Sequence, residues 1–207
     1  MFQPIFQGWA ITGWAGVAMA VLVAASLGGL GHTEEGLRTI VRWSTRVGAL
    51  VFALVFAARP LHQLLRRDWT AWALRNRRFL GVSFAVMHFT HLGALVAWAS
   101  LENRAFVAEL PPVTLYGGGG LYLLLGLMTL TSFDRTAALL GRRAWKALHV
   151  WGLFSLWFAL TANYLGAAIA ESVSFAPLAL VLLAALGVRI RAWFARRSAA
   201  PAVAQAS

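Results

Sequence analysis

The sequence of 207 residues contains no cysteine and only seven acidic residues. The lack of cysteine excludes iron–sulfur clusters, covalently attached c-type haem, disulfide bonds and thiolate catalysis, so any metal needs histidine, methionine, carboxylate or backbone ligands. All seven carboxylates fall in expected loops or at helix ends. This placement argues against an ion-coupled carboxylate transporter or a proton pump, which need carboxylates inside the membrane.

Apolar residues are abundant instead: 60% of the chain is hydrophobic. Runs near 20 apolar residues recur along the whole length, which is typical of a helical multi-pass membrane protein. We predict an all-α integral membrane protein, a six-transmembrane-helix bundle over residues 1–197 with a disordered tail at 198–207. The first run is too long for a signal peptide and lacks a basic segment before it, which favours a retained helix. The predicted helices are Trp9–Leu30, Thr39–Leu65, Arg78–Leu101, Val113–Phe133, Arg142–Ala170 and Ser174–Phe194.

Basic residues give a net charge of +11 and are unevenly distributed between the two ends of these helices. Fourteen of the 18 Lys and Arg residues fall at one end (six in 59–78, four in 135–146 and four in 189–197), and four at the other. The positive-inside rule therefore predicts that both termini are cytoplasmic. Placement in short loops argues against nucleic-acid binding. The basic loop RRDWTAWALRN, with two tryptophans, is expected to lie along the lipid headgroups.

Three histidines fall inside apolar runs, where an ionisable ring is costly and indicates a function. His88 and His91 share one face of the third helix, and His149 lies on the fifth helix. Their arrangement suggests axial ligands of an iron porphyrin, the alternative being hydrogen bonds to Ser or Thr on a neighbouring helix. His91 lies about 20 Å along its helix and His149 about 9 Å beyond Arg143, so depth favours His88 as the partner of His149.

The other two histidines have simpler interpretations. His62 lies near the expected cytoplasmic end of the second helix, where an interfacial, solvated role is expected. His32 falls in the outer loop GHTEEG, where solvent exposure is the default. Glu34 and Glu35 beside it form at most a weak, non-specific metal site.

Cations gather at the expected cytoplasmic ends of the third and fifth helices. They are Arg77, Arg78, Arg142, Arg143 and Lys146. Pairing with haem propionates is their functional interpretation, with Arg78 and Arg143 as the candidates. Membrane topology and contacts with lipid headgroups are the alternative for each of them.

Three stretches resemble the ferric-reductase-like transmembrane domain family. NRRFLGVSFAVMHFTHLGAL is similar to that family's third helix, with His91 ten residues after Gly81 at a ligand position. LGRRAWKALHVWGLF is similar to the start of its fifth helix and places His149 at a ligand position. RVGALVFALVFAARPL is similar to its second helix, which ends in a proline. In length and layout the chain is most similar to the six-helix haem b subunit of periplasmic methionine sulfoxide reductase systems.

The resemblance implies haem b, held by His91 and His149, with His88 as a substitute for His91. One departure limits the number of haems. The family usually has a histidine thirteen residues after the position of His149, and this chain has Ala162 there. At most one haem b is therefore expected, and we take His91 as the ligand on the third helix.

The resulting expectation is a bacterial inner-membrane electron carrier, possessing no flavin or nicotinamide domain of its own. By analogy, electrons arrive from quinol or a cytoplasmic flavin reductase and leave to a periplasmic acceptor. Such a chain would serve as an electron-transfer subunit of an oxidoreductase system. The alternative is an accessory subunit of a larger membrane complex with a degenerate or chlorin-binding site. A small-solute transporter is disfavoured because no internal repeat is evident.

Overall fold

The computed structural model describes residues 3–101, 108 and 111–204, and these residues form helices and turns without any strand. Six of the described helices are long and apolar enough to cross a bilayer. This confirms the all-α class and the six spans, while the cytoplasmic orientation of the termini stays a prediction. The six spans correspond to α1 (Trp9–Leu30), α2 (Glu34–Leu65), α4 (Arg77–Leu101), α6 (Pro112–Leu130), α7 (Asp134–Ala170) and α8 (Ala176–Ala204).

Three short elements complete the described fold: η1 (Pro4–Phe6), α3 (Asp68–Arg75) and η2 (Val173–Phe175). Helix α3 occupies the stretch that we expected at the lipid headgroups. Thr70 closes its first turn, because its hydroxyl donates to the Arg67 carbonyl at 2.7 Å and accepts from the Arg67 amide at 3.1 Å. The Trp72 indole donates to the Phe6 carbonyl at 2.7 Å, which ties α3 to the N-terminal segment.

Two helices begin earlier than predicted. Helix α2 starts at Glu34 instead of Thr39, because the Thr33 side chain caps it by accepting from the Gly36 amide at 3.2 Å. Glu34 and Glu35 thus lie in the first turn of a helix and not in a loop. Their negative charges are stabilising there, because the N-terminus is the positive end of the helix dipole. Glu34 also pairs with Arg38 at 3.0 Å.

Helix α7 starts at Asp134 instead of Arg142, with a sharp bend at Gly141. The φ of Gly141 is +72°, a left-handed value that glycine adopts without steric cost. The predicted start at Arg142 therefore coincides with the straight part of α7. Helix α8 includes residues 198–204 of the expected tail, and residues 205–207 lie outside the described part.

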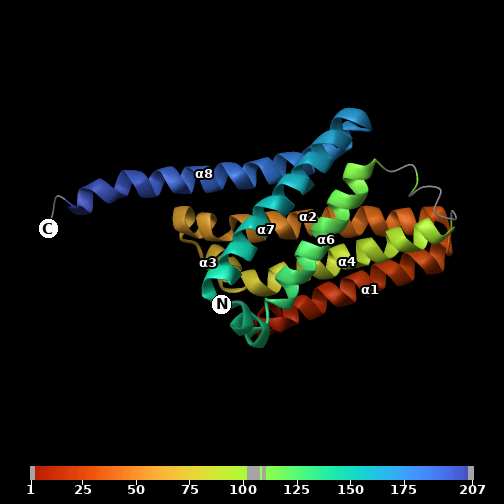
Figure 1. The fold of residues 1–207 in the computed structure, drawn as a ribbon, viewed down its shortest axis with the longest axis horizontal. Helices are drawn as coiled ribbons and strands as arrows, with labels where there is room; N and C mark the ends of the chain where they lie inside the picture. Colours follow the sequence, from red (N-terminus) through yellow and green to blue (C-terminus); the bar gives the residue numbers. More distant parts are fainter. Residues whose placement is uncertain (1–2, 102–107, 109–110, 205–207) are drawn as a thin grey trace.

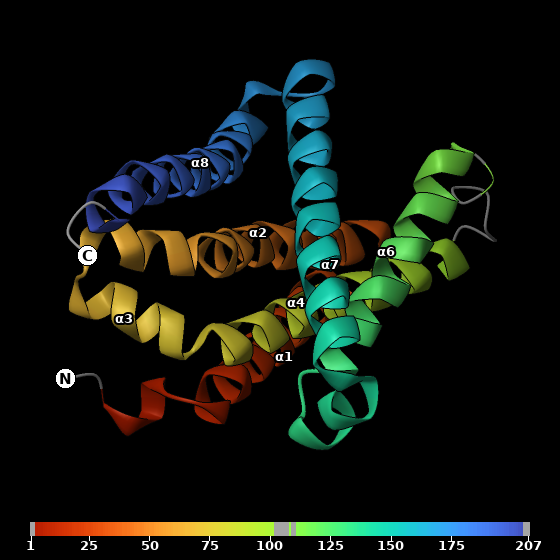
Figure 2. The same ribbon diagram turned by 60° about the vertical axis from the view of Figure 1, so that its left-hand side comes forward.

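Helix α2 is the centre of the packing (Figure 1), with α4 along one side and α8 along another, while α1 packs on α4. Helices α6 and α7 run steeply inclined to α2 in both views (Figure 2). The buried core includes Phe52 and Phe56 of α2, Phe84 of α4 and Leu182 of α8. The histidine-bearing α4 is therefore held firmly against α2, whereas α7 crosses the assembly.

Large apolar side chains cover the outside of α6 and α7. The most exposed include Val113, Leu139, Trp151 and Ile169, at 78%, 85%, 75% and 81%. Such surfaces are stable in hydrocarbon but not in water. The exposure pattern supports a lipid bilayer as the environment of these helices.

Candidate functional site

His88 is buried in the interface between α4 and α2. Its ring packs on Gly48: a Cβ atom at that position would lie 2.9 Å from His88 Cε1. The Phe84 ring, one turn earlier on α4, lies 4.1 Å from the His88 ring between centroids. His88 Nδ1 has no hydrogen-bond partner of good geometry. His88 thus places a buried nitrogen without a partner in a tightly packed interface.

His91 lies one turn further along α4 and also faces α2. Its Nδ1 atom lies 3.3 Å from the Val41 carbonyl oxygen, which can only accept, so Nδ1 is assigned as the donor. This assignment leaves Nε2 of the neutral ring unprotonated. The Tyr122 ring of α6 stacks at 6.5 Å between centroids. His91 is therefore oriented by a backbone carbonyl, as metal-binding histidines commonly are.

His149 lies at the other side of the assembly, on α7 next to the end of α6. Its Nε2 atom is 3.1 Å from the Thr131 hydroxyl oxygen. That hydroxyl donates to the Leu127 carbonyl at 2.7 Å, so His149 Nε2 is assigned as the donor to Thr131. This contact is a hydrogen bond to a Thr beside a neighbouring helix, which was the alternative to haem ligation for these histidines.

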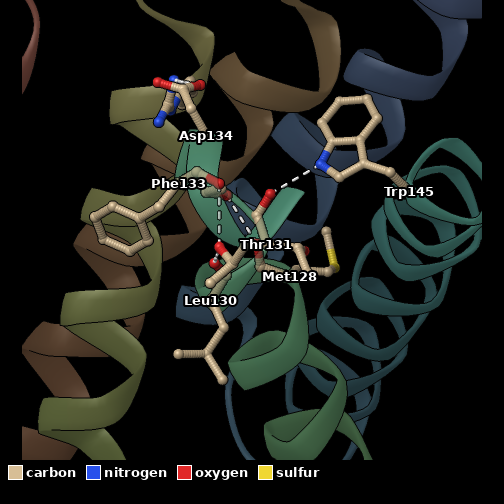
Figure 3. Close-up of polar contacts among 9 residues, drawn as sticks. Met128, Leu130, Thr131, Phe133, Asp134 and Trp145 are labelled. Carbon is tan, nitrogen blue, oxygen red and sulfur yellow. Dashed lines mark hydrogen bonds and ion pairs between the residues drawn. The ribbon is translucent and has the colours of Figure 1, made fainter. Parts of the chain in front are cut away.

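Trp145 and Thr131 hold the His149 ring in place. The indole ring of Trp145, one turn before His149, stacks on the imidazole at 4.4 Å between centroids. Its Nε1 donates to the Thr131 carbonyl at 2.9 Å, as Figure 3 shows. Thr131 thus contacts Trp145 through its carbonyl and His149, one turn further along α7, through its hydroxyl.

The turn between α6 and α7 fixes this contact locally. The Thr136 hydroxyl donates to the carbonyls of Leu130 and Phe133. Leu130 is the last residue of α6, where carbonyls lack intrahelical donors, whereas the Phe133 carbonyl also accepts from the Ala137 amide at 2.9 Å. The turn therefore sets the position of Thr131 relative to α7.

A cavity of about 320 Å³, the inner cavity, lies among α2, α4, α6 and α7. His149, Trp145 and Thr131 line it together with the two arginines at the start of α4. Most of the remaining lining is apolar: Phe52, Val55, Gly81, Phe84, Leu125, Met128, Leu153 and Leu156. Its volume falls at the lower end of small-molecule sites, which span roughly 300–1,000 Å³.

A second cavity of about 340 Å³, the basic cavity, lies where α2, α4, α7 and α8 meet. It is lined by five cations, namely Arg59, Arg77, Lys146, Arg189 and Arg196, with Gln63, Pro60, Trp145, His149, Val150, Leu153 and Phe154. The structure thus brings basic residues from four separate segments to one end of the assembly, hereafter the basic end. His149 lines both cavities.

The arginines that we singled out as propionate partners differ in placement. Arg78 lines the inner cavity and donates to Asp134 at 2.8 Å. Asp134 is 91% exposed, so this ion pair contributes little to stability. Arg142 and Arg143 are exposed and line neither cavity. Of the two candidates, Arg78 is the one that the structure brings to His149.

The two histidine regions remain separate. Among the described residues, ring contacts join His88 to His91 and His149 to Trp145, but none joins His149 to either α4 histidine. The inner cavity reaches α4 at Gly81 and Phe84, one turn before His88. Within the same described part, no group of three or more His, Asp or Glu residues converges as a metal site.

The remaining positions singled out in the sequence lie away from both cavities. His62 Nδ1 contacts the Thr70 hydroxyl at 3.1 Å, and His32 is exposed. Ala162, where a second histidine was missing, is exposed on α7. Thr131 was not singled out from the sequence, although its position directly after Leu130 and before a basic helix was visible in the stretch LTSFDR.

Comparison of the chain with protein-family models, curated proteins and solved structures gives no match. The resemblance to ferric-reductase-like domains therefore rests on the three sequence stretches alone. Function has to be argued from the site.

Proposed function

We propose that this chain is a multi-pass membrane protein that binds one b-type haem and carries electrons. The observation that supports this most is the position of His149 on the wall of an apolar cavity inside the helices. A histidine on a largely apolar cavity wall would be a suitable ligand for haem iron. Bacterial inner-membrane localisation, a quinol or flavin-reductase donor and a periplasmic acceptor are part of the proposal by analogy only.

The residues present fit the chemistry of haem at two points. His149 supplies an imidazole at the cavity, and Arg78 supplies a cation at the same cavity for a propionate. His91, oriented through Nδ1 by the Val41 carbonyl, has an unprotonated Nε2, but it does not line the inner cavity, so its role as a second ligand is part of the proposal by family resemblance alone. Ligation by His149 Nε2 requires exchange of its hydrogen bond to Thr131 for a bond to iron.

Bound haem with two histidine ligands supplies a one-electron couple without an open position for substrate. The chain's own residues tune and protect that couple. Phe84, Leu125 and Leu156 give the cavity an apolar wall, and a charge beside an apolar wall acts more strongly than one in water. Arg78 adds positive charge at the cavity, which favours the reduced state of a cofactor placed there. Its weak pair with exposed Asp134 leaves Arg78 able to exchange partners.

One observation favours a second candidate function, an accessory subunit whose cofactor site has been lost. The Nε2 atom of His149 is already satisfied by Thr131, and the position of the usual second histidine on this helix is Ala162. A hydrogen-bonded histidine needs no cofactor to explain its burial. In this alternative the six helices serve as a scaffold within a larger membrane complex.

Visible absorption of the purified protein, oxidised and then reduced with dithionite, separates the two. The proposal predicts sharp reduced α and β bands and a pyridine haemochrome of haem b. His149→Ala is expected to lower the bound haem at least about tenfold, because it removes a ligand directly. His32→Ala is the matched control, since it removes an exposed imidazole outside both cavities.

The proposal fails if protein expressed with ample haem supply shows no Soret band. It also fails if His149→Ala retains the full spectrum while remaining folded by circular dichroism. Either result would favour the second candidate function, an accessory subunit without a cofactor.

A further inference from the structure

The five cations of the basic cavity have no carboxylate among its lining residues. Within the described part of the chain, ion pairs join only Arg38 to Glu34 and Arg78 to Asp134, and neither pair belongs to this cavity. Like charges so close together repel one another. A concentration of positive charge without internal neutralisation indicates that an anion completes it.

Pro60 explains why Arg189 is held there, and a second arginine is held beside it. Proline has no amide hydrogen, so the Phe56 carbonyl one turn earlier in α2 loses its helical donor. Arg189 of α8 supplies the replacement, with Nη1 donating to the Phe56 carbonyl at 2.7 Å. Arg77 of α4 donates through Nε to the adjacent Val55 carbonyl at 3.1 Å. The end of α2 around Pro60 thus anchors one guanidinium group from α4 and one from α8.

Anchoring leaves most hydrogen-bond donors of these arginines available. A guanidinium group has five N–H donors, and the bonds above use one from each side chain. Arg189 is also held over the Phe56 and Phe154 rings, at 4.4 and 5.0 Å from their centroids. The conformational entropy of these guanidinium groups is therefore already lost in the folded protein before a ligand binds, which favours tight binding.

The flank of the basic cavity indicates where the anion comes from. Val150 and Phe154 of α7 line the cavity and are 45% and 37% exposed. An apolar, exposed flank beside a cationic cavity at the end of membrane-spanning helices suits a phospholipid, with acyl chains on the flank and phosphate in the cavity. Free phosphate would use the cations but not the flank.

We propose that the basic cavity is a binding site for the phosphate group of an anionic phospholipid. Arg77 and Arg189 hold the phosphate as fixed donors, and Arg59, Lys146 and Arg196 supply the surrounding charge. Arg77 and His149 line both cavities, so the cavity double variant below changes only residues that line the basic cavity and not the inner cavity of the proposed haem.

The test is a titration of the purified full chain in detergent with dioctanoyl phosphatidylglycerol, dioctanoyl phosphatidylcholine or inorganic phosphate. The midpoint of thermal unfolding, followed by far-ultraviolet circular dichroism, reports binding. Phosphatidylglycerol is expected to raise the midpoint in a saturable manner, because a ligand of the folded state stabilises it. Phosphatidylcholine, which has no net charge, is expected to have little effect.

Two double variants with equal loss of charge make the test specific. Arg59→Gln with Lys146→Gln removes two cations of the cavity whose side chains make no hydrogen bond within the described part of the chain, so folding is preserved. This pair is expected to weaken phosphatidylglycerol binding about thirty-fold, because each charge near the membrane surface contributes about 1 kcal/mol, which is about fivefold in affinity. Arg135→Gln with Arg191→Gln removes two exposed cations outside the cavity and is expected to leave binding unchanged.

Equal responses of the two double variants would overturn the proposal, because binding would then depend on net charge alone. An absent response of the unmodified protein to phosphatidylglycerol would overturn it as well. If inorganic phosphate stabilises the protein as strongly as phosphatidylglycerol at the same concentration, the lipid assignment is wrong and the ligand is free phosphate.

Discussion

The α2–α4 interface and the α6–α7 side of the molecule both carry histidines, but they hold them in different ways. His88 and His91 are held by dense packing: a glycine at position 48 accommodates one ring, and a backbone carbonyl orients the other. His149 is held by a hydroxyl and a stacked indole on the wall of a cavity. The comparison teaches that an imidazole available for a ligand requires adjacent space, whereas one in a packed interface requires the backbone to make room for it.

The largest expected effect concerns the choice between the two α4 histidines. If the proposed haem takes His91 as its second ligand, His91→Ala is expected to lower haem content at least about tenfold, although His91 lies in the packed interface and not on the cavity wall. His88→Ala is expected to retain the haem, since its role is to fill the interface beside Gly48. Pyridine haemochrome content per protein measures both. The opposite ranking would assign the ligand to His88.

A test of the packed interface is Gly48→Ala. The added Cβ would lie 2.9 Å from the His88 ring, and the ring is rigid and enclosed. We expect destabilisation by about 1–3 kcal/mol, as overpacking in a dense core typically gives. Unfolding in mixed micelles with increasing denaturing detergent measures it. An unchanged midpoint would show that this interface is looser than its packing indicates.

The hydrogen bond between Thr131 and His149 on the cavity side is tested by Thr131→Val. The substitution keeps the shape of the side chain and removes the hydroxyl that contacts His149 Nε2. We expect a loss of about 0.6 kcal/mol, the average for hydrogen bonds inside membrane proteins. The same unfolding assay applies. Haem content is expected to be kept or raised, because His149 no longer has a competing partner; a fall in haem content would contradict this assignment.

The smallest effect is expected at Gly152, the counterpart of Gly48 on the cavity side. A Cβ there would approach the Met128 sulfur and side-chain carbons, which belong to a flexible chain at the inner cavity. Met128 can move into that space, so Gly152→Ala is expected to cost less than about 1 kcal/mol. Comparing the unfolding midpoints of Gly48→Ala and Gly152→Ala is the direct measurement. A larger loss for Gly152→Ala would reverse the contrast between the two regions.

The sequence by itself determined the helical class, the six spans and the placement of the histidines along them. The reason is local, because a span in lipid satisfies its backbone hydrogen bonds within its own helix and needs about 20 apolar residues. The start of α2 at Glu34 was missed because the cap depends on a single Thr33 side chain within a polar stretch. The bend at Gly141 was anticipated only as a helix boundary.

Only the tertiary structure decided which side chains meet. Arg189 contacts the carbonyl of Phe56, a residue 133 positions earlier in the chain, and no local pattern encodes such a pairing. The contact of His149 with Thr131 depends on how the turn after α6 places α7. The five cations of the basic cavity come from three helices in addition to α2. Apolar periodicity places residues along a span, but the mutual rotation and tilt of the helices, set by packing, determine which of them share a cavity.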